Sequence, residues 1–160
     1  MTRIERARRA AGGLSIAGAI AWGISPAARA QTWSGAGADS NWSTAGNWIG
    51  GGAPVSGNTT VVTFTPPMVG IFSTVDAPFT LNRLELLGGV PFTLGGSAIS
   101  FDGVSPRLVV AGPYAVANDL SFVVTTTIDS SVSHSLTGQV AGIGGLTKAG
   151  TGRLTLAGRP

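Results

Sequence analysis

Short runs of alternating apolar and polar residues recur along the chain from residue 59 onward. Near the C-terminus, Leu154 and Leu156 alternate with small or polar residues, which is the pattern of a strand that buries one face. This pattern predicts strands at residues 59–65, 70–75, 79–87, 91–94, 98–102, 107–110, 120–128, 132–136, 145–148 and 153–157. Since no segment of residues 31–160 has helical periodicity, we predict an all-β fold.

Glycine-rich turn signals separate the predicted strands, among them Gly95-Gly96 and Gly144-Gly145. Sandwiches, barrels and solenoids all contain many short strands, so periodicity alone does not choose between them. Recurring glycine pairs, few charged residues and the lack of a predicted helix favour a parallel β-helix, a solenoid of a few rungs. A rung of about 20 to 25 residues cannot bury its own apolar face, so roughly three or more rungs must stack.

The first thirty residues have the three parts of a secretory signal. Residues 2–9 hold four arginines and one acid, residues 10–24 are uncharged and mostly apolar, and Ala28-Arg29-Ala30 matches a cleavage site. The apolar run is shorter than the ~20 residues that a transmembrane helix needs. We therefore predict a signal peptide over residues 1–30, export, and a mature chain that begins at Gln31 and has no transmembrane span. An uncleaved membrane anchor is the alternative.

Removing the signal peptide changes the charge of the chain. The whole sequence has a formal charge of +3, but five of its ten basic residues lie in the signal, so the mature chain has a formal charge of −1. No basic cluster remains, which argues against a nucleic-acid partner. The chain has no cysteine, so hydrogen bonds and apolar burial must hold the exported domain together without disulfides.

Two segments resemble a known family. Residues 144–158 read GGLTKAGTGRLTLAG, a strand, a Gly-x-Gly turn and an alternating strand. This segment resembles the autotransporter-associated β-strand repeat, also called the passenger-associated transport repeat. The matching residues are Gly144, Gly145, Leu146, Lys148, Gly150, Gly152, Leu154, Leu156 and Gly158. Residues 31–58, rich in Trp, Gly and Asn, resemble the opening of many proteins that contain this repeat, and we expect them to form an N-terminal cap before β-helix rungs at residues 59–160.

The resemblance implies a right-handed parallel β-helix in the passenger region of a bacterial surface or secreted protein. It implies a structural role in secretion and folding of the passenger, with adhesion to host or glycan surfaces as a further role. Its partners would be the export machinery and a membrane barrel translocator. Only Arg159 and Pro160 follow Gly158, which leaves no room for such a barrel, so we expect a fragment or truncated reading frame, with a small stand-alone relative as the alternative.

The tryptophans of the mature chain suggest a second function. Trp33, Trp42 and Trp48 are spaced by Gly, Ser and Asn and could form an aromatic platform for sugar rings, as in a small secreted carbohydrate-binding module. Alternatively, the same rings close the open N-terminal end of the solenoid, where a large amphipathic ring covers apolar area and its N–H finds a carbonyl. We favour the closing role.

Residues that serve enzymes or metal sites are few. His134 is the only histidine, and alternation places it on the face of Val132 and Leu136, opposite Ser133 and Ser135. We therefore expect a structural histidine and not a hydrolase triad.

The acids of residues 76–129 are dispersed: Asp76, Glu85, Asp102, Asp119 and Asp129. Stacked rungs can align two of them, as a glycosidase requires, but nothing in the sequence demands it. We predict a non-enzymatic protein with no catalytic, cofactor or metal site.

Overall fold

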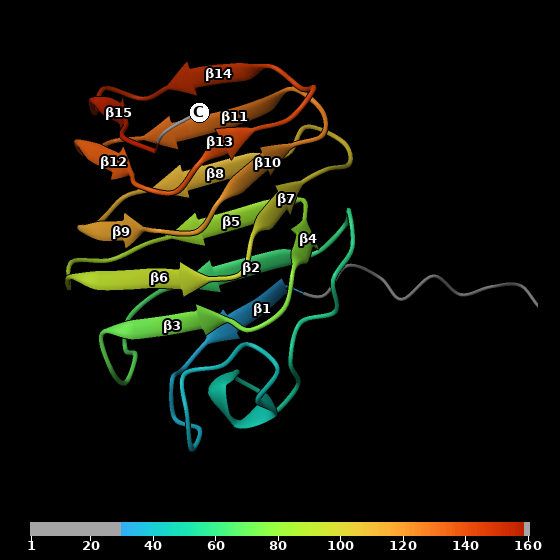
Figure 1. The fold of residues 1–160 in the computed structure, drawn as a ribbon. Coiled ribbons are helices and arrows are strands. Elements are labelled where there is room, and N and C mark those ends of the chain that lie inside the picture. The colour runs from blue at the N-terminus through green and yellow to red at the C-terminus, as the bar shows by residue number, and fades with distance from the viewer. Residues whose placement is uncertain (1–29, 159–160) are drawn as a thin grey trace, which may run out of the picture.

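Three parallel sheets wind around a common core and form a β-solenoid of about five turns (Figure 1). The structure, a computed structural model, describes residues 30–158, so the predicted signal peptide lies outside the described residues except for Ala30. Each full turn contributes one strand to each sheet in the same order. This arrangement confirms the predicted parallel β-helix.

The described strands divide among three sheets. The first sheet has the order β1 (Ala30–Trp33), β2 (Val61–Phe64), β5 (Arg83–Leu86), β8 (Arg107–Val110), β11 (Thr126–Ser130) and β14 (Leu146–Ala149). The second has β3 (Phe72–Val75), β6 (Phe92–Gly96), β9 (Tyr114–Val116), β12 (His134–Leu136) and β15 (Leu154–Leu156). The third has β4 (Phe79–Leu81), β7 (Ile99–Phe101), β10 (Leu120–Phe122) and β13 (Val140–Ala141).

Each turn of the solenoid repeats the positions of the turn before it. In the first sheet Leu84 pairs with Leu108, Leu108 with Ile128, and Ile128 with Lys148. The spacing of these partners along the chain agrees with the expected rung of about 20 to 25 residues. The register keeps inward positions in line, so Leu84, Leu108 and Ile128 stack in one column and are all 0% exposed. Each such side chain contributes about 1.5–3 kcal/mol by burial.

Two predicted strands are each divided between two sheets. The strand predicted at residues 79–87 breaks at Asn82 into β4 and β5, and the one at 120–128 breaks at residues 123–125 into β10 and β11. At Asn82 the side-chain Nδ2 donates to the carbonyl oxygens of Asp102 and Val104, each at 3.1 Å. Leu81 and Leu84 are both buried although they are three residues apart. The alternation of buried and exposed positions therefore shifts by one residue at this corner.

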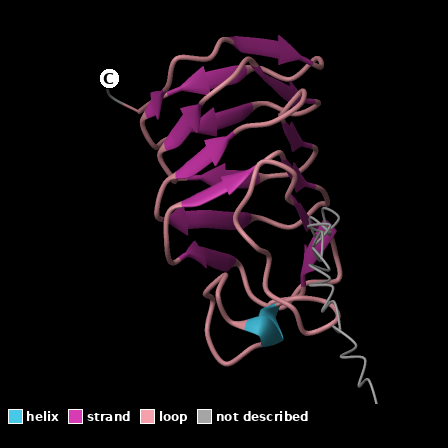
Figure 2. Cartoon of the chain, turned by 90° about the vertical axis from the view of Figure 1, so that its right-hand side faces the viewer, coloured by secondary structure: helices cyan, strands magenta, loops and turns pink. Residues whose placement is uncertain are grey.

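Residues 34–58 fold over the N-terminal end of the solenoid and include a 3-10 helix, η1 (Ala45–Asn47), as Figure 2 shows. Trp33, Trp42 and Trp48 pack there against one another and against Phe64, with ring centroids 5.1–6.5 Å apart. Among residues 30–158, no helix is long and apolar enough to cross a membrane.

Candidate functional site

The segment that resembles the β-strand repeat, residues 144–158, forms the last described turn of the solenoid. It contains β14 and β15, each of which lies at the outer end of its sheet (Figure 1). On their inner side, β14 pairs with β11 and β15 pairs with β12. The repeat is therefore the surface on which a further turn would stack.

Glycines bring the corners of this turn against the backbone of the turn before it. A Cβ atom on Gly144 or Gly152 would collide with the carbonyl oxygen of Val124 or Val132, respectively. At Gly158, a Cβ would collide with the carbonyl oxygen of Gly138. A larger residue would push the corner away and break the hydrogen bonds between turns, so these glycines of the motif are required by close stacking.

Two other residues take part in the same stacking: Gly138, which was not singled out in the sequence, and Asp119, which was noted there only as one of the dispersed acids. Gly138 lies one turn before Gly158, and a Cβ there would collide with the carbonyl oxygen of Asn118. The Asp119 carboxylate accepts a hydrogen bond at 2.8 Å from the N–H of Gln139, one turn later in the chain. A search for glycines that recur at the length of one turn could have found Gly138 and Gly158. The role of Asp119 depends on the geometry of the corner, which the sequence does not show.

Lys148 occupies an inward position in the first sheet, stacked on the buried Ile128. Its Nζ donates to the carbonyl oxygen of Ala149 and, at 3.0 Å, to that of Gly150. The aliphatic stem thus lies over the apolar column while the ammonium bonds backbone at the corner, a common behaviour of lysine at an apolar boundary. The conspicuous lysine of the repeat is part of the end surface of the solenoid.

Two inward positions of the last described turn are open to solvent. Leu146 is 39% exposed and Leu156 is 49% exposed, although the residues beneath them, Thr126 and Leu136, are 0% exposed. By contrast, Trp33, Trp42 and Trp48 at the opposite end are at most 2% exposed. Over residues 30–158, the stack therefore has a closed N-terminal end and a last described turn whose outer side is uncovered.

Two of the three indole N–H groups have internal partners, whereas Trp33 Nε1 has none among the described residues. Trp42 Nε1 donates to Ser73 Oγ at 2.7 Å, and Trp48 Nε1 donates to the Trp42 carbonyl oxygen at 2.8 Å. Because all three rings are buried, no ring face is available in this arrangement for a sugar to stack on. Their placement is that of the predicted closing role, and it does not support a platform of Trp33, Trp42 and Trp48.

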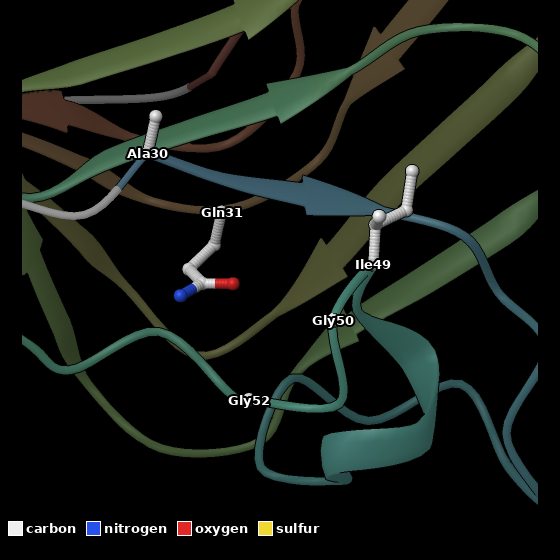
Figure 3. A pocket seen from close by; sticks show the side chains of 5 residues that line it. All are labelled: Ala30, Gln31, Ile49, Gly50 and Gly52. Carbon is white, nitrogen blue, oxygen red and sulfur yellow. The ribbon is translucent and has the colours of Figure 1, made fainter.

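Two hollows lie beside the cap. One, of about 420 Å³, is lined by Ala30, Gln31, Ile49, Gly50 and Gly52, and the Gln31 side chain points toward the loop at Gly50 (Figure 3). Among the described residues, its lining includes no titratable side chain. The other, of about 220 Å³, lies between the cap and the corner before β4 and includes one carboxylate, Asp76.

The dispersed acids accept hydrogen bonds in turns or form ion pairs. Desolvation by itself would raise the pKa of Asp76, but hydrogen bonds from Ser43, whose N–H donates at 3.0 Å, outweigh it and lower the pKa. Asp102 accepts from the N–H of Gly103 at 2.7 Å. Within residues 30–158, no three His, Asp or Glu side chains form a group that could hold a metal ion.

Glu85 and Asp129 are aligned on the outer face of the first sheet, as stacked rungs allow, with Val109 between them. This spacing is two strand separations, roughly 10 Å between backbones. Each acid faces an arginine: Glu85 lies 2.7 Å from Arg83, and Asp129 lies 3.8 Å from Arg107. Both carboxylates therefore belong to partly exposed ion pairs along the sheet.

His134 faces the core, as the alternation predicted. It is 6% exposed, and its Nε2 has no hydrogen-bond partner among the described residues. Burial lowers the pKa of His134, and a hydrogen bond with the backbone of Tyr114 opposes this effect in part. Its place in the stack is that of a core side chain.

Comparison with known proteins finds no match for this chain among protein-family models, curated proteins or solved structures.

We expect Gly152→Ala to weaken docking of the last turn by about 1–3 kcal/mol, because the new methyl group overlaps the carbonyl of Val132. Trypsin cleavage at Lys148 and Arg153 reports undocking of this turn. The cleavage rate should rise about tenfold for each 1.4 kcal/mol of docking free energy that is lost. Gly145→Ala is the matched control, since a Cβ there would lie 3.2 Å from the Thr125 hydroxyl, which can rotate away. Equal cleavage of both variants would contradict the stacking role.

Acidification should destabilise the fold through His134. Because the folded-state pKa of His134 lies below its unfolded value, the unfolded chain takes up the proton first, and stability is lost as pH falls below about 6.5. Urea unfolding at pH 7 and pH 5 measures this loss, and the pH dependence should be smaller in His134→Leu. An identical dependence in both proteins would show that His134 does not titrate on unfolding in this range.

Proposed function

We propose that this chain is a structural segment of the passenger region of an exported, autotransporter-like bacterial surface protein. In this role it assists secretion and folding of the passenger outside the cell. The observation that carries the proposal is the difference between the two ends of the described solenoid. Tryptophans close the N-terminal end, whereas the turn formed by residues 144–158 leaves the inward Leu146 and Leu156 exposed.

A stack with one closed and one open end favours folding in one direction. Each docked turn offers an edge of backbone N–H and C=O groups and a row of apolar side chains to the next turn. A segment that emerges on the outer side of a membrane can therefore dock on the turn already folded, and its burial opposes backward movement. The signal-like leader and the repeat resemblance at residues 144–158 support the same role.

The glycines of the repeat supply the test of this function. The chain with its own leader is fused upstream of a membrane translocator domain in a bacterial host, and surface display is measured by the accessibility of the passenger to external protease. We expect the double variant Gly144→Ala/Gly152→Ala to reduce the displayed fraction several-fold, because turns that cannot dock do not drive folding outside the cell.

Gly145→Ala serves as the control for this experiment, since its new methyl group meets only a side chain. Equal display of the double variant and the unmodified chain, at equal expression, would overturn the proposed function. N-terminal sequencing of the displayed protein tests export separately, with Gln31 as the expected first residue.

A further inference from the structure

The hollow of about 220 Å³ beside the N-terminal cap has the features of a small binding site. Three separate segments line it: Trp42 and Ser43 of the cap, Pro54 and Ser56 that follow the cap helix, and the corner at residues 76–79. Pockets for drug-sized ligands measure about 300–1,000 Å³, so this hollow suits a smaller chemical group.

The walls of the hollow are mainly apolar and are held in place. Pro54, Ala77, Pro78 and Phe79 present carbon surface to it. The Phe79 ring meets the Trp42 ring edge-on, with centroids 5.1 Å apart and planes at 80°. The two proline rings fix their own backbone angle φ, so these walls keep their shape when the hollow is empty. A preformed apolar wall favours a ligand with a short apolar part.

The polar side of the hollow accepts hydrogen bonds, because its donors already have partners. Trp42 Nε1 donates to Ser73 Oγ at 2.7 Å. The N–H of Ser43 donates to the Asp76 carboxylate at 3.0 Å, and the Ser43 side chain bonds the same carboxylate. The two oxygens of a carboxylate accept about four hydrogen bonds, so Asp76 has room for further donors. The hollow therefore requires a ligand that donates hydrogen bonds.

The charge of Asp76 has no partner in the described part of the chain. Residues 30–82 contain two acids, Asp39 and Asp76, and neither arginine nor lysine. The ion pairs among residues 30–158 join Arg83 to Glu85 and Arg107 to Asp129, so neither includes Asp76. This end of the solenoid thus has a formal charge of −2 over residues 30–82, with one of its carboxylates in the lining of the hollow.

Asp39 adds to the negative potential beside the hollow. Hydrogen bonds from the N–H of Asn41 and the hydroxyl of Thr44 lower the pKa of Asp39, against a repulsion from Asp76 that tends to raise it. The two carboxylates are therefore close enough to repel each other while both stay ionised at neutral pH. A positive charge in the hollow would pair with Asp76 and offset this repulsion.

From these contacts we infer that the hollow binds a small organic cation, a guanidinium or ammonium group on a short apolar stem. The stem lies against Pro78 and Phe79, and the cationic head donates to the Asp76 carboxylate. Charge-assisted hydrogen bonds and the aromatic ring both favour a cation over a neutral group of the same shape. An arginine or lysine side chain of a polypeptide and a free amine share this chemistry. The site is independent of the scaffold role.

Three small probes test the site: butylguanidinium, butylammonium and the neutral butylurea. Each is titrated into isotope-labelled protein, and the shifts of the backbone amide NMR signals give the affinity. We expect both cations to bind about tenfold more tightly than butylurea at low salt, with shifts centred on the segments that line the hollow and an advantage that shrinks as salt screens the charge. Equal binding of all three probes, binding of none, or shifts elsewhere in the chain would overturn the inference.

The variant Asp76→Asn separates charge from shape. Asparagine keeps a side-chain oxygen for the N–H of Ser43, so the variant should fold, which circular dichroism checks, and it should lose the preference for the cations. Asp102→Asn is the matched control, because Asp102 also accepts a backbone N–H at a corner, from Gly103 at 2.7 Å, but does not line the hollow. A preference that survives Asp76→Asn, or that both variants lose equally, would contradict the assignment.

Two short peptides distinguish the sources of the cation. One holds a single arginine among glycines and serines, and the other holds the neutral citrulline in its place. Tighter binding of the arginine peptide than of butylguanidinium identifies a polypeptide side chain as the ligand, and weaker binding identifies a free amine; both results support a cation site. Equal binding of the arginine and citrulline peptides would count against it.

Discussion

Hydrogen bonding between successive turns, in parallel register, is the interaction on which this structure depends. No turn of about twenty residues can pair its own backbone or bury its own leucines. The register that joins Leu108 to Ile128 and Ile128 to Lys148 keeps inward side chains in columns, and the corner glycines let the backbone of one turn contact the next. Glycines such as Gly144, Gly152 and Gly158 stand where the backbone of one turn touches the backbone of the turn before it.

The constraint makes the two ends of the stack special, because each end lacks a neighbour on one side. At the N-terminal end, residues 34–58 cover the core with Trp33, Trp42 and Trp48, and each indole adds apolar area at a site that must exclude water. At the other end, the described residues leave leucines and strand edges open, with Lys148 over the last apolar column. The proposed scaffold role rests on this difference between the two described ends.

Local signals in the sequence were sufficient for the class of fold, because alternation and glycine turns are both local. They were insufficient at the corners: the alternating run through Asn82 looks continuous, and only contacts with the following turn reveal that the chain changes sheets there. The strand β9 is short and follows Pro113, so it was not predicted. At the site, the motif singled out Leu146 and Lys148, but that both face inward depends on the register with β11.

Amide hydrogen exchange along the solenoid tests the central claim, one closed and one open end, most directly. Local stability governs exchange, so amides whose turns have neighbours on both sides exchange slowly. The account predicts slow exchange in β5 and β8, comparable protection of β1 beneath the tryptophan cap, and the fastest exchange among the strands in β14 and β15. Uniform protection through the last turn, or fastest exchange in β1, would contradict it.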